Sequence, residues 1–145
     1  MRKSLILLAM ALASVIIANR NVCAASDIQC SSNFEVEQNA YGQNKYKTSV
    51  NIAGLDKNIA FDRIYNFFGK DGLQISGSDR KAGVISAINP VMHSKKTTPF
   101  NVVIEADNSG CQIALTYVTE PGMTANPRDV VYYFCQVIGA ASGIH

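Results

Sequence analysis

Few side chains in this 145-residue chain are of the types that perform chemistry, and they are widely separated. The histidines are His93 and His145, and no His, Cys or Asp spacing supplies the several convergent ligands that a metal site needs. A serine or cysteine hydrolase needs a nucleophile beside an oriented base, but His93 is the one internal histidine and no Gly-x-Ser-x-Gly motif occurs. We therefore expect no catalytic residues, no metal site and no cofactor.

Three carboxylates near the end of the chain leave one catalytic alternative open. Glu105, Asp107 and Glu120 would have to meet in space to act as an acid–base pair, and nothing in their spacing favours such a meeting. An enzyme of unrecognised type is therefore the third interpretation, behind a binding protein and a ligand carrier.

Residues 1–25 have the pattern of a cleavable secretory signal peptide. Arg2 and Lys3 precede an apolar run over residues 4–18, and the small residues Ala24 and Ala25 follow. The run is shorter than the roughly 20 residues of a spanning helix, so we expect cleavage before Ala25 or Ser26 and contact with the membrane only during export. The sequence thus predicts a periplasmic or secreted protein.

Cys23 offers an alternative, in which a lipid-modified cysteine becomes the first mature residue. The residues before it are Arg20, Asn21 and Val22, which match poorly the small and apolar residues of such a processing site. Lipidation of Cys23 is therefore the less favoured alternative.

Removal of the leader changes the charge balance. Loss of Arg2, Lys3 and Arg20 reduces the 13 basic residues to 10 against 11 acidic ones, a net charge of −1. Proteins that bind polyanions carry a basic excess, so we expect no nucleic-acid partner.

Cys30, Cys111 and Cys135 remain after cleavage, and an oxidising compartment favours pairing. We predict a Cys111–Cys135 disulfide, because both residues lie in expected regular elements that should pack together. Cys30 lies in residues 26–44, which are expected to form a polar N-terminal tail with a short extended piece at 34–37. Two alternatives stay open: Cys30 captures either partner, or all three remain thiols.

The region 45–145 reads as one domain with an antiparallel sheet. Alternating apolar residues predict strands over 46–52, 100–106 and 111–119, and a hairpin joins 73–75 to 84–88. On the last strand, the alternation places Cys111 on the same side as the core residues.

Two helices flank these strands in sequence. The first is expected from a cap at Asp56 or Asn58 to a stop at Gly69, and the second from a cap at Asn126, followed by proline, to Gly139. The order β-α-β-β-β(-β)-α, with two helices packed on one sheet face, predicts a two-layer α+β sandwich.

The hairpin after the first helix carries a resemblance to a known family. The run from Gly72 to Ser86 contains Gly-Leu-Gln-Ile, an Asp-containing turn and Gly-Val-Ile-Ser. This order resembles the small helix-grip-like envelope domains of the outer-membrane assembly lipoprotein C type, over about residues 45–139. The resemblance implies a non-enzymatic envelope protein that works by contact. The chain departs from that pattern in its single domain, its cysteines and its lack of a convincing lipid-attachment site.

Residues 89–99 are expected to form a loop of 11 residues. This loop contains the candidate binding residues His93, Lys95 and Lys96, because long loops on rigid scaffolds often bind partners. We expect an exported, non-catalytic envelope protein that contacts another envelope protein. The alternative is a carrier of a small apolar ligand between the first helix and the sheet, although the bulky side chains of that helix favour a filled core.

Overall fold

Residues 44–53 alternate polar and apolar side chains, and in the computed structural model of the chain they form the long strand β2 (Asn44–Ala53). The structure describes residues 26, 29–90 and 97–144. Tyr46, Val50 and Ile52 are buried on one side of β2, as the alternation predicts.

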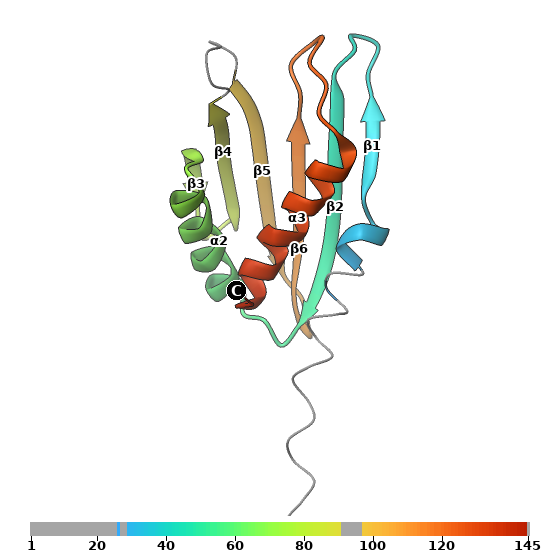
Figure 1. The fold of residues 1–145 in the computed structure, drawn as a ribbon. Helices are drawn as coiled ribbons and strands as arrows, with labels where there is room; N and C mark the ends of the chain where they lie inside the picture. Colours follow the sequence, from blue (N-terminus) through green and yellow to red (C-terminus); the bar gives the residue numbers. More distant parts are fainter. Residues whose placement is uncertain (1–25, 27–28, 91–96, 145) are drawn as a thin grey trace, which may run out of the picture.

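Six strands form one sheet in the order β1-β2-β6-β5-β4-β3, and every neighbouring pair is antiparallel. Both long helices, α2 and α3, lie on the same side of this sheet (Figure 1). The predicted α+β class is confirmed. The remaining strands are β1 (Glu35–Gln38), β3 (Gln74–Asp79), β4 (Val84–Pro90), β5 (Thr97–Ala106) and β6 (Gly110–Val118).

The helix α2 (Lys57–Asp71) begins and ends at local signals in its sequence. The side chain of Asp56 accepts hydrogen bonds from the amides of Asn58 and Ile59, which fixes the cap that the sequence left open between Asp56 and Asn58. The helix ends at Gly72, whose φ of 82° is the left-handed conformation that glycine adopts without strain. The predicted stop at Gly69 was therefore one turn too early.

The helix α3 (Pro127–Ser142) starts at the predicted cap, where the side chain of Asn126 accepts from the amide of Arg128. It continues past Gly139, the predicted end, to a left-handed Gly143. Ala140 and Ala141 are buried, so the last turn extends the apolar face of the helix and lengthens its contact with the core.

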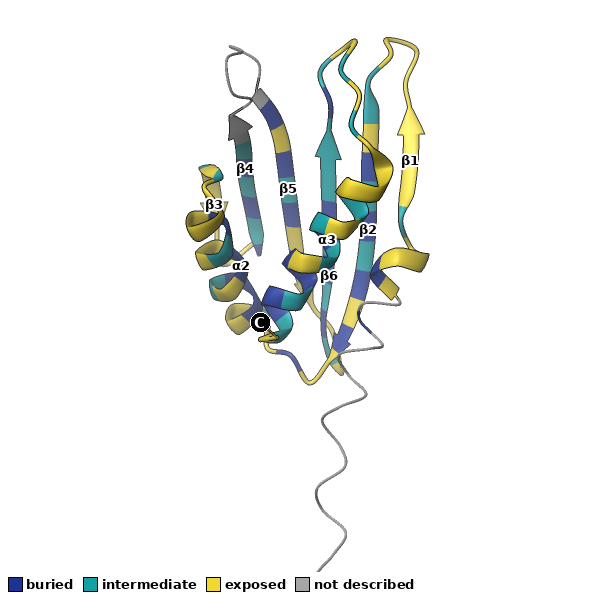
Figure 2. Cartoon of the chain, in the orientation of Figure 1, coloured by how far each residue is buried: buried dark blue, intermediate teal, exposed yellow. Residues whose placement is uncertain are grey.

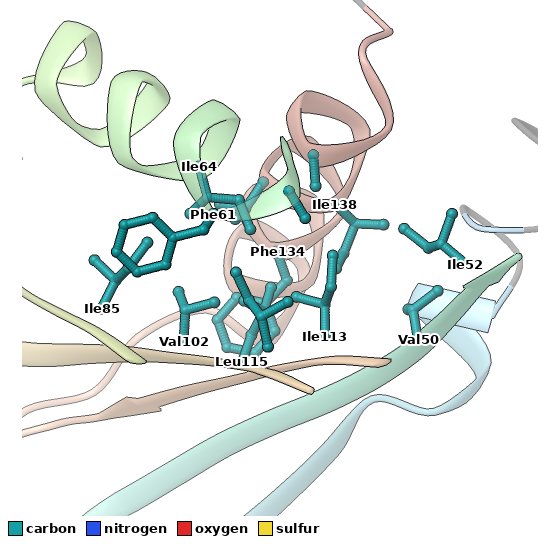
Figure 3. Close-up of a cluster of buried hydrophobic side chains, with 14 of the residues drawn as sticks. Val50, Ile52, Phe61, Ile64, Ile85, Val102, Ile113, Leu115, Phe134 and Ile138 are labelled. Carbon is teal, nitrogen blue, oxygen red and sulfur yellow. The ribbon is translucent and has the colours of Figure 1, made fainter. Parts of the chain in front are cut away.

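The core lies between the two helices and the sheet (Figure 3). Figure 2 shows buried positions alternating along the central strands. The largest fully buried side chains come from both layers: Tyr46, Val50, Ile64, Phe68, Ile85, Val102, Ile104, Ile113, Leu115, Phe134, Val137 and Ile138.

The segment before β2 belongs to the domain, contrary to the predicted polar tail. Phe34 packs its ring against Tyr46 and Phe134, with centroid separations of 6.1 and 5.9 Å. Cys30 is fully buried, and its carbonyl accepts a hydrogen bond from the hydroxyl of Thr48. The apolar residues of this segment are too few and too irregularly spaced to form a periodic pattern. Its many polar residues therefore led to the prediction of a tail.

Cys30 is bonded to Cys135, and Cys111 is a buried free thiol. The predicted Cys111–Cys135 pair was therefore wrong, although Cys111 does face the core as predicted. The reason is geometric. Cys111 is the second residue of β6, which covers roughly 30 Å, whereas Cys135 is bonded to Cys30, whose carbonyl lies beside Thr48 of β2. Since Thr48 pairs with Leu115, four residues along β6 from Cys111, Cys111 and Cys135 lie at different heights over the sheet.

Candidate functional site

The residues that the sequence singled out do not form a site in the described part of the chain. His93, Lys95, Lys96 and His145 lie outside the described residues. Within the described residues, no three His, Cys, Asp or Glu side chains gather closely enough to hold a metal ion. No described helix has the length and apolar character needed to cross a membrane.

The space between the helices and the sheet is occupied by aromatic rings. Phe100 of β5 is at the centre and meets Phe68 and Phe134 edge-on, with centroid separations of 5.3 and 5.4 Å. Its ring also meets those of Tyr117 and Tyr133, at 6.4 and 5.7 Å. These rings fill the position that an apolar ligand would need.

A shallow hollow of 430 Å³ lies along α2, where Arg63, Asn66, Phe67, Lys70 and Asp71 line it. Its polar groups hold the two helices together. The guanidinium of Arg63 donates to the carbonyl of Ala141 at 2.9 Å, and the Tyr133 hydroxyl donates to the carboxylate of Asp71 at 2.7 Å. We therefore assign this hollow a structural role.

Burial and the bond to Asp71 raise the pKa of Tyr133 above its ordinary value. The phenol hydroxyl consequently stays protonated and keeps donating to Asp71 through the neutral pH range.

The other face of the sheet is not covered by α2 or α3 (Figure 1). On each strand its side chains alternate with the buried ones, and we call the set from β4, β5 and β6 the open face. Among these described positions Glu105 is the one that carries a charge. The open face consists of Val84, Ser86, Ile88, Pro99, Asn101, Val103, Glu105, Gln112, Ala114, Thr116 and Val118.

The strand register builds the centre of the open face from uncharged rows. Ala114 pairs with Val103, and Val103 pairs with Val84, so small apolar side chains cross three strands side by side. The next row joins Thr116 to Asn101. Val103, at 37% exposure, is the most accessible large apolar side chain of this face.

Charged side chains border the open face on its β2 side. At one margin, Lys47 of β2 forms ion pairs with Glu35 and Glu37 of β1. Its hydrogen bond to Glu37 lowers the pKa of that carboxyl and raises the pKa of Lys47, so this margin stays charged. The surface therefore has an uncharged centre, with charges at its β2 margin and at Glu105.

Both edges of the sheet are protected against pairing with a further strand. The β1 edge carries the charges of Glu35 and Glu37, and the β3 edge has a register shift between Ile75 and Gly77. Charges and bulges on edge strands are devices that discourage strand addition. The open face is thus a more suitable contact surface than either edge.

The open face was not predicted from the sequence. Its signal was present, because residues 99–105 and 112–118 contain a single charge at the positions that alternate with the core. The significance of those positions depends on the register, which aligns strands distant in sequence.

Comparison with known proteins gives no family for the chain. No family model and no curated protein matches it. A conserved protein of unknown function from Enterococcus faecalis superposes with a TM-score of 0.49 at 6% identity, covering 81% of both chains. A DUF4468 family protein from Bacteroides ovatus superposes with a TM-score of 0.41 at 12% identity, covering 74% of this chain and 88% of that one. Neither similarity informs on function.

Proposed function

We propose that this protein is an exported, non-catalytic envelope protein that binds another envelope protein through the open face of its sheet. The observation that carries the proposal is the uncharged centre of that face, with charges at its β2 margin and at Glu105. Protein interfaces have this anatomy, with charges depleted at the centre and polar groups at the margin. A sheet face that contacts only water usually carries polar and charged side chains, so the lack of charge at the centre of this face favours a protein contact.

A folded protein with a flat and uncharged surface is the occupant that fits this face best. Three strands, β4, β5 and β6, and four rows of side chains give a flat area of roughly 400 Å². A second copy placed against this face would bury roughly 800 Å² in total, below the usual size of a stable interface. A larger partner that extends beyond the margins of the open face could bury more surface area than a second copy.

Export is supported by two independent features. Residues 1–25 have the charge and apolar pattern of a cleavable leader. The Cys30–Cys135 disulfide is of the kind that persists in oxidising compartments such as the periplasm. The likeness of the 72–86 hairpin to the outer-membrane assembly lipoprotein C type agrees with an envelope role.

Site-specific photo-crosslinking in the native host tests the proposal. A photoreactive benzoylphenylalanine is introduced at Val103 or Thr116 on the open face, and at Tyr132 on the exposed side of α3 as the matched control. The protein captured from the open face is identified, produced separately and titrated against purified wild-type protein, Val103→Lys and Tyr132→Lys.

We expect Val103→Lys to weaken this binding about 10-fold or more, because it places an unpaired charge in the interface, and Tyr132→Lys to leave it unchanged. Equal binding by both variants, or capture from Tyr132 but not from the open face, would refute a role for this face. Lipid that remains bound in native mass spectrometry would instead support the carrier alternative.

A further inference from the structure

The tip of the β1–β2 hairpin holds one aromatic side chain in solvent. Tyr41 is 82% exposed, more than any other large hydrophobic residue in the described part of the chain. Among the described residues, no aromatic ring lies against Tyr41. A ring in this position contributes nothing to the core.

The loop that carries Tyr41 is nevertheless highly organised. The side-chain oxygen of Asn39 accepts from the amides of Tyr41 and Gln43, at 2.9 and 3.0 Å. Its side-chain nitrogen donates to the Oε1 atom of Gln43 at 2.8 Å. The Asn39 carbonyl accepts from the amide of Gly42, and the Asn39 amide donates to the carbonyl of Gln43. Five hydrogen bonds therefore centre on Asn39.

The base of the hairpin is also fixed to the rest of the sheet. The amide of Asn44 donates to the hydroxyl oxygen of Thr119, and the amide of Thr119 donates to the carbonyl of Asn44, both at 2.9 Å. Gly42 has a φ of 74°, which allows the tight reversal of the chain. Tyr41 is thus held on a rigid support that continues into the central strands.

We propose that this hairpin tip is a second contact site, at which Tyr41 inserts into an apolar pocket on a protein partner. Tyrosine is well suited to this role because a large ring is immobilised at little entropic cost. A loop that is already ordered avoids the further cost of ordering on binding.

The residues beside Tyr41 indicate the chemistry of the pocket rim. Residues 38–44 read Gln-Asn-Ala-Tyr-Gly-Gln-Asn and carry no charge. The pocket should therefore have an uncharged rim, with backbone or amide groups that meet the phenol hydroxyl and the side chains of Gln38 and Asn44. This site is separate from the open face and does not depend on it.

The experiment places the photoreactive benzoylphenylalanine at position 41 of the full chain in its native host, with position 132 as the matched exposed tyrosine. The captured protein is identified, produced separately and used as the probe in titrations with purified variants. We expect Tyr41→Ala to weaken binding about 30-fold or more, Tyr41→Phe to weaken it less, and Tyr132→Ala to leave it unchanged. All three variants should keep the wild-type urea midpoint.

A further variant tests the support of the loop. Asn39→Ala keeps the ring but removes its scaffold, so it should weaken binding while the exposed fraction of Tyr41 stays high. Binding of the probe that is unaffected by Tyr41→Ala, or the absence of an adduct from position 41, overturns this inference. Adducts from Val103 or Thr116 without one from position 41 would refute this inference and leave the proposed function intact. An adduct from position 41 without one from Val103 or Thr116 would refute the role of the open face and leave this inference intact.

Discussion

The ring of Phe34 meets the ring of Phe134 edge-on, with 5.9 Å between the centroids and 74° between the planes. Phe34 precedes β1, and Phe134 is in the middle of α3, so the contact joins the beginning and the end of the described domain. The same Phe134 ring also meets Phe100 of β5. One side chain of α3 therefore connects the N-terminal segment to the centre of the sheet.

Phe134→Ala should lower the free energy of unfolding by about 3–5 kcal/mol, because it leaves a cavity at this junction. Urea denaturation followed by circular dichroism measures the change. Tyr132→Ala, two residues away and 67% exposed, is the control and should change stability by no more than about 0.5 kcal/mol. A small loss for Phe134→Ala would contradict the described packing of α3.

Removal of the disulfide by Cys30→Ala together with Cys135→Ala should cost about 2–5 kcal/mol, because the bond restricts the unfolded chain over 105 residues. Reductant should lower the urea midpoint of the wild-type protein and of Cys111→Ala by similar amounts. Peptide mapping without reduction should find Cys30 linked to Cys135. A peptide that links Cys111 to either partner would refute this connectivity.

Tyr133→Phe should lower stability at neutral pH by about 1 kcal/mol, through loss of the hydrogen bond to Asp71. Burial, and then Asp71, raise the pKa of Tyr133 in the folded protein. The raised pKa contributes stability that is present below the phenol pKa of the unfolded chain, about 10, and is lost as the pH rises above it.

The stability difference between wild type and Tyr133→Phe should therefore shrink between pH 8 and pH 11. Urea midpoints of the two proteins across that range measure it, and their difference removes the contribution of other titrating groups. A stability difference that stays constant or grows over this range would show that the folded protein does not raise the pKa of the Tyr133 hydroxyl.

Gly83→Ala should cost about 2 kcal/mol or more. Gly83 has a φ of 81°, and a Cβ atom there would lie 2.1 Å from the carbonyl oxygen of Ile104. Gly77→Ala in the adjoining strand is the control, because its Cβ would meet no atom within 4 Å. Comparable urea midpoints for the two variants would mean that the turn between β3 and β4 is not held against β5 as described.

The mature protein from its native host should begin at Ala25 or Ser26, because small residues precede both positions. N-terminal sequencing together with intact mass measurement checks this. A retained Met1 would exclude cleavage, and a mass increase with Cys23 as the first residue would identify a lipoprotein.

Local chemistry predicted the regular elements well. Asn126 followed by Pro127 marks the start of α3, and the alternation in β2 and β6 assigns the correct residues to the core. The ends of the helices were less certain, because Gly69 and Gly72 compete at the end of α2, and Gly139 and Gly143 at the end of α3. A glycine ends a helix only where tertiary contacts direct the following residues away from the helix axis.

The cysteine pairing and the open face depend on relationships that a single sequence does not contain. Cys30 reaches Cys135 because the 29–34 segment packs beside α3, an arrangement decided by tertiary contacts of Phe34. The open face arises because Val84, Val103 and Ala114 share a row, which is a matter of strand register. Both features arise only when segments distant in sequence are aligned in three dimensions, and neither leaves a recognisable pattern within a single segment.

The position of Cys111 between Cys30 and Cys135 along the chain affects oxidative folding. During synthesis Cys111 becomes available before Cys135, so an oxidase that acts early would join Cys30 to the wrong partner. Burial of Cys111 in β6 raises the pKa of its thiol and conceals it from attack once the sheet has formed. Correct pairing thus requires either that the sheet closes before oxidation or that a disulfide isomerase repairs the early product.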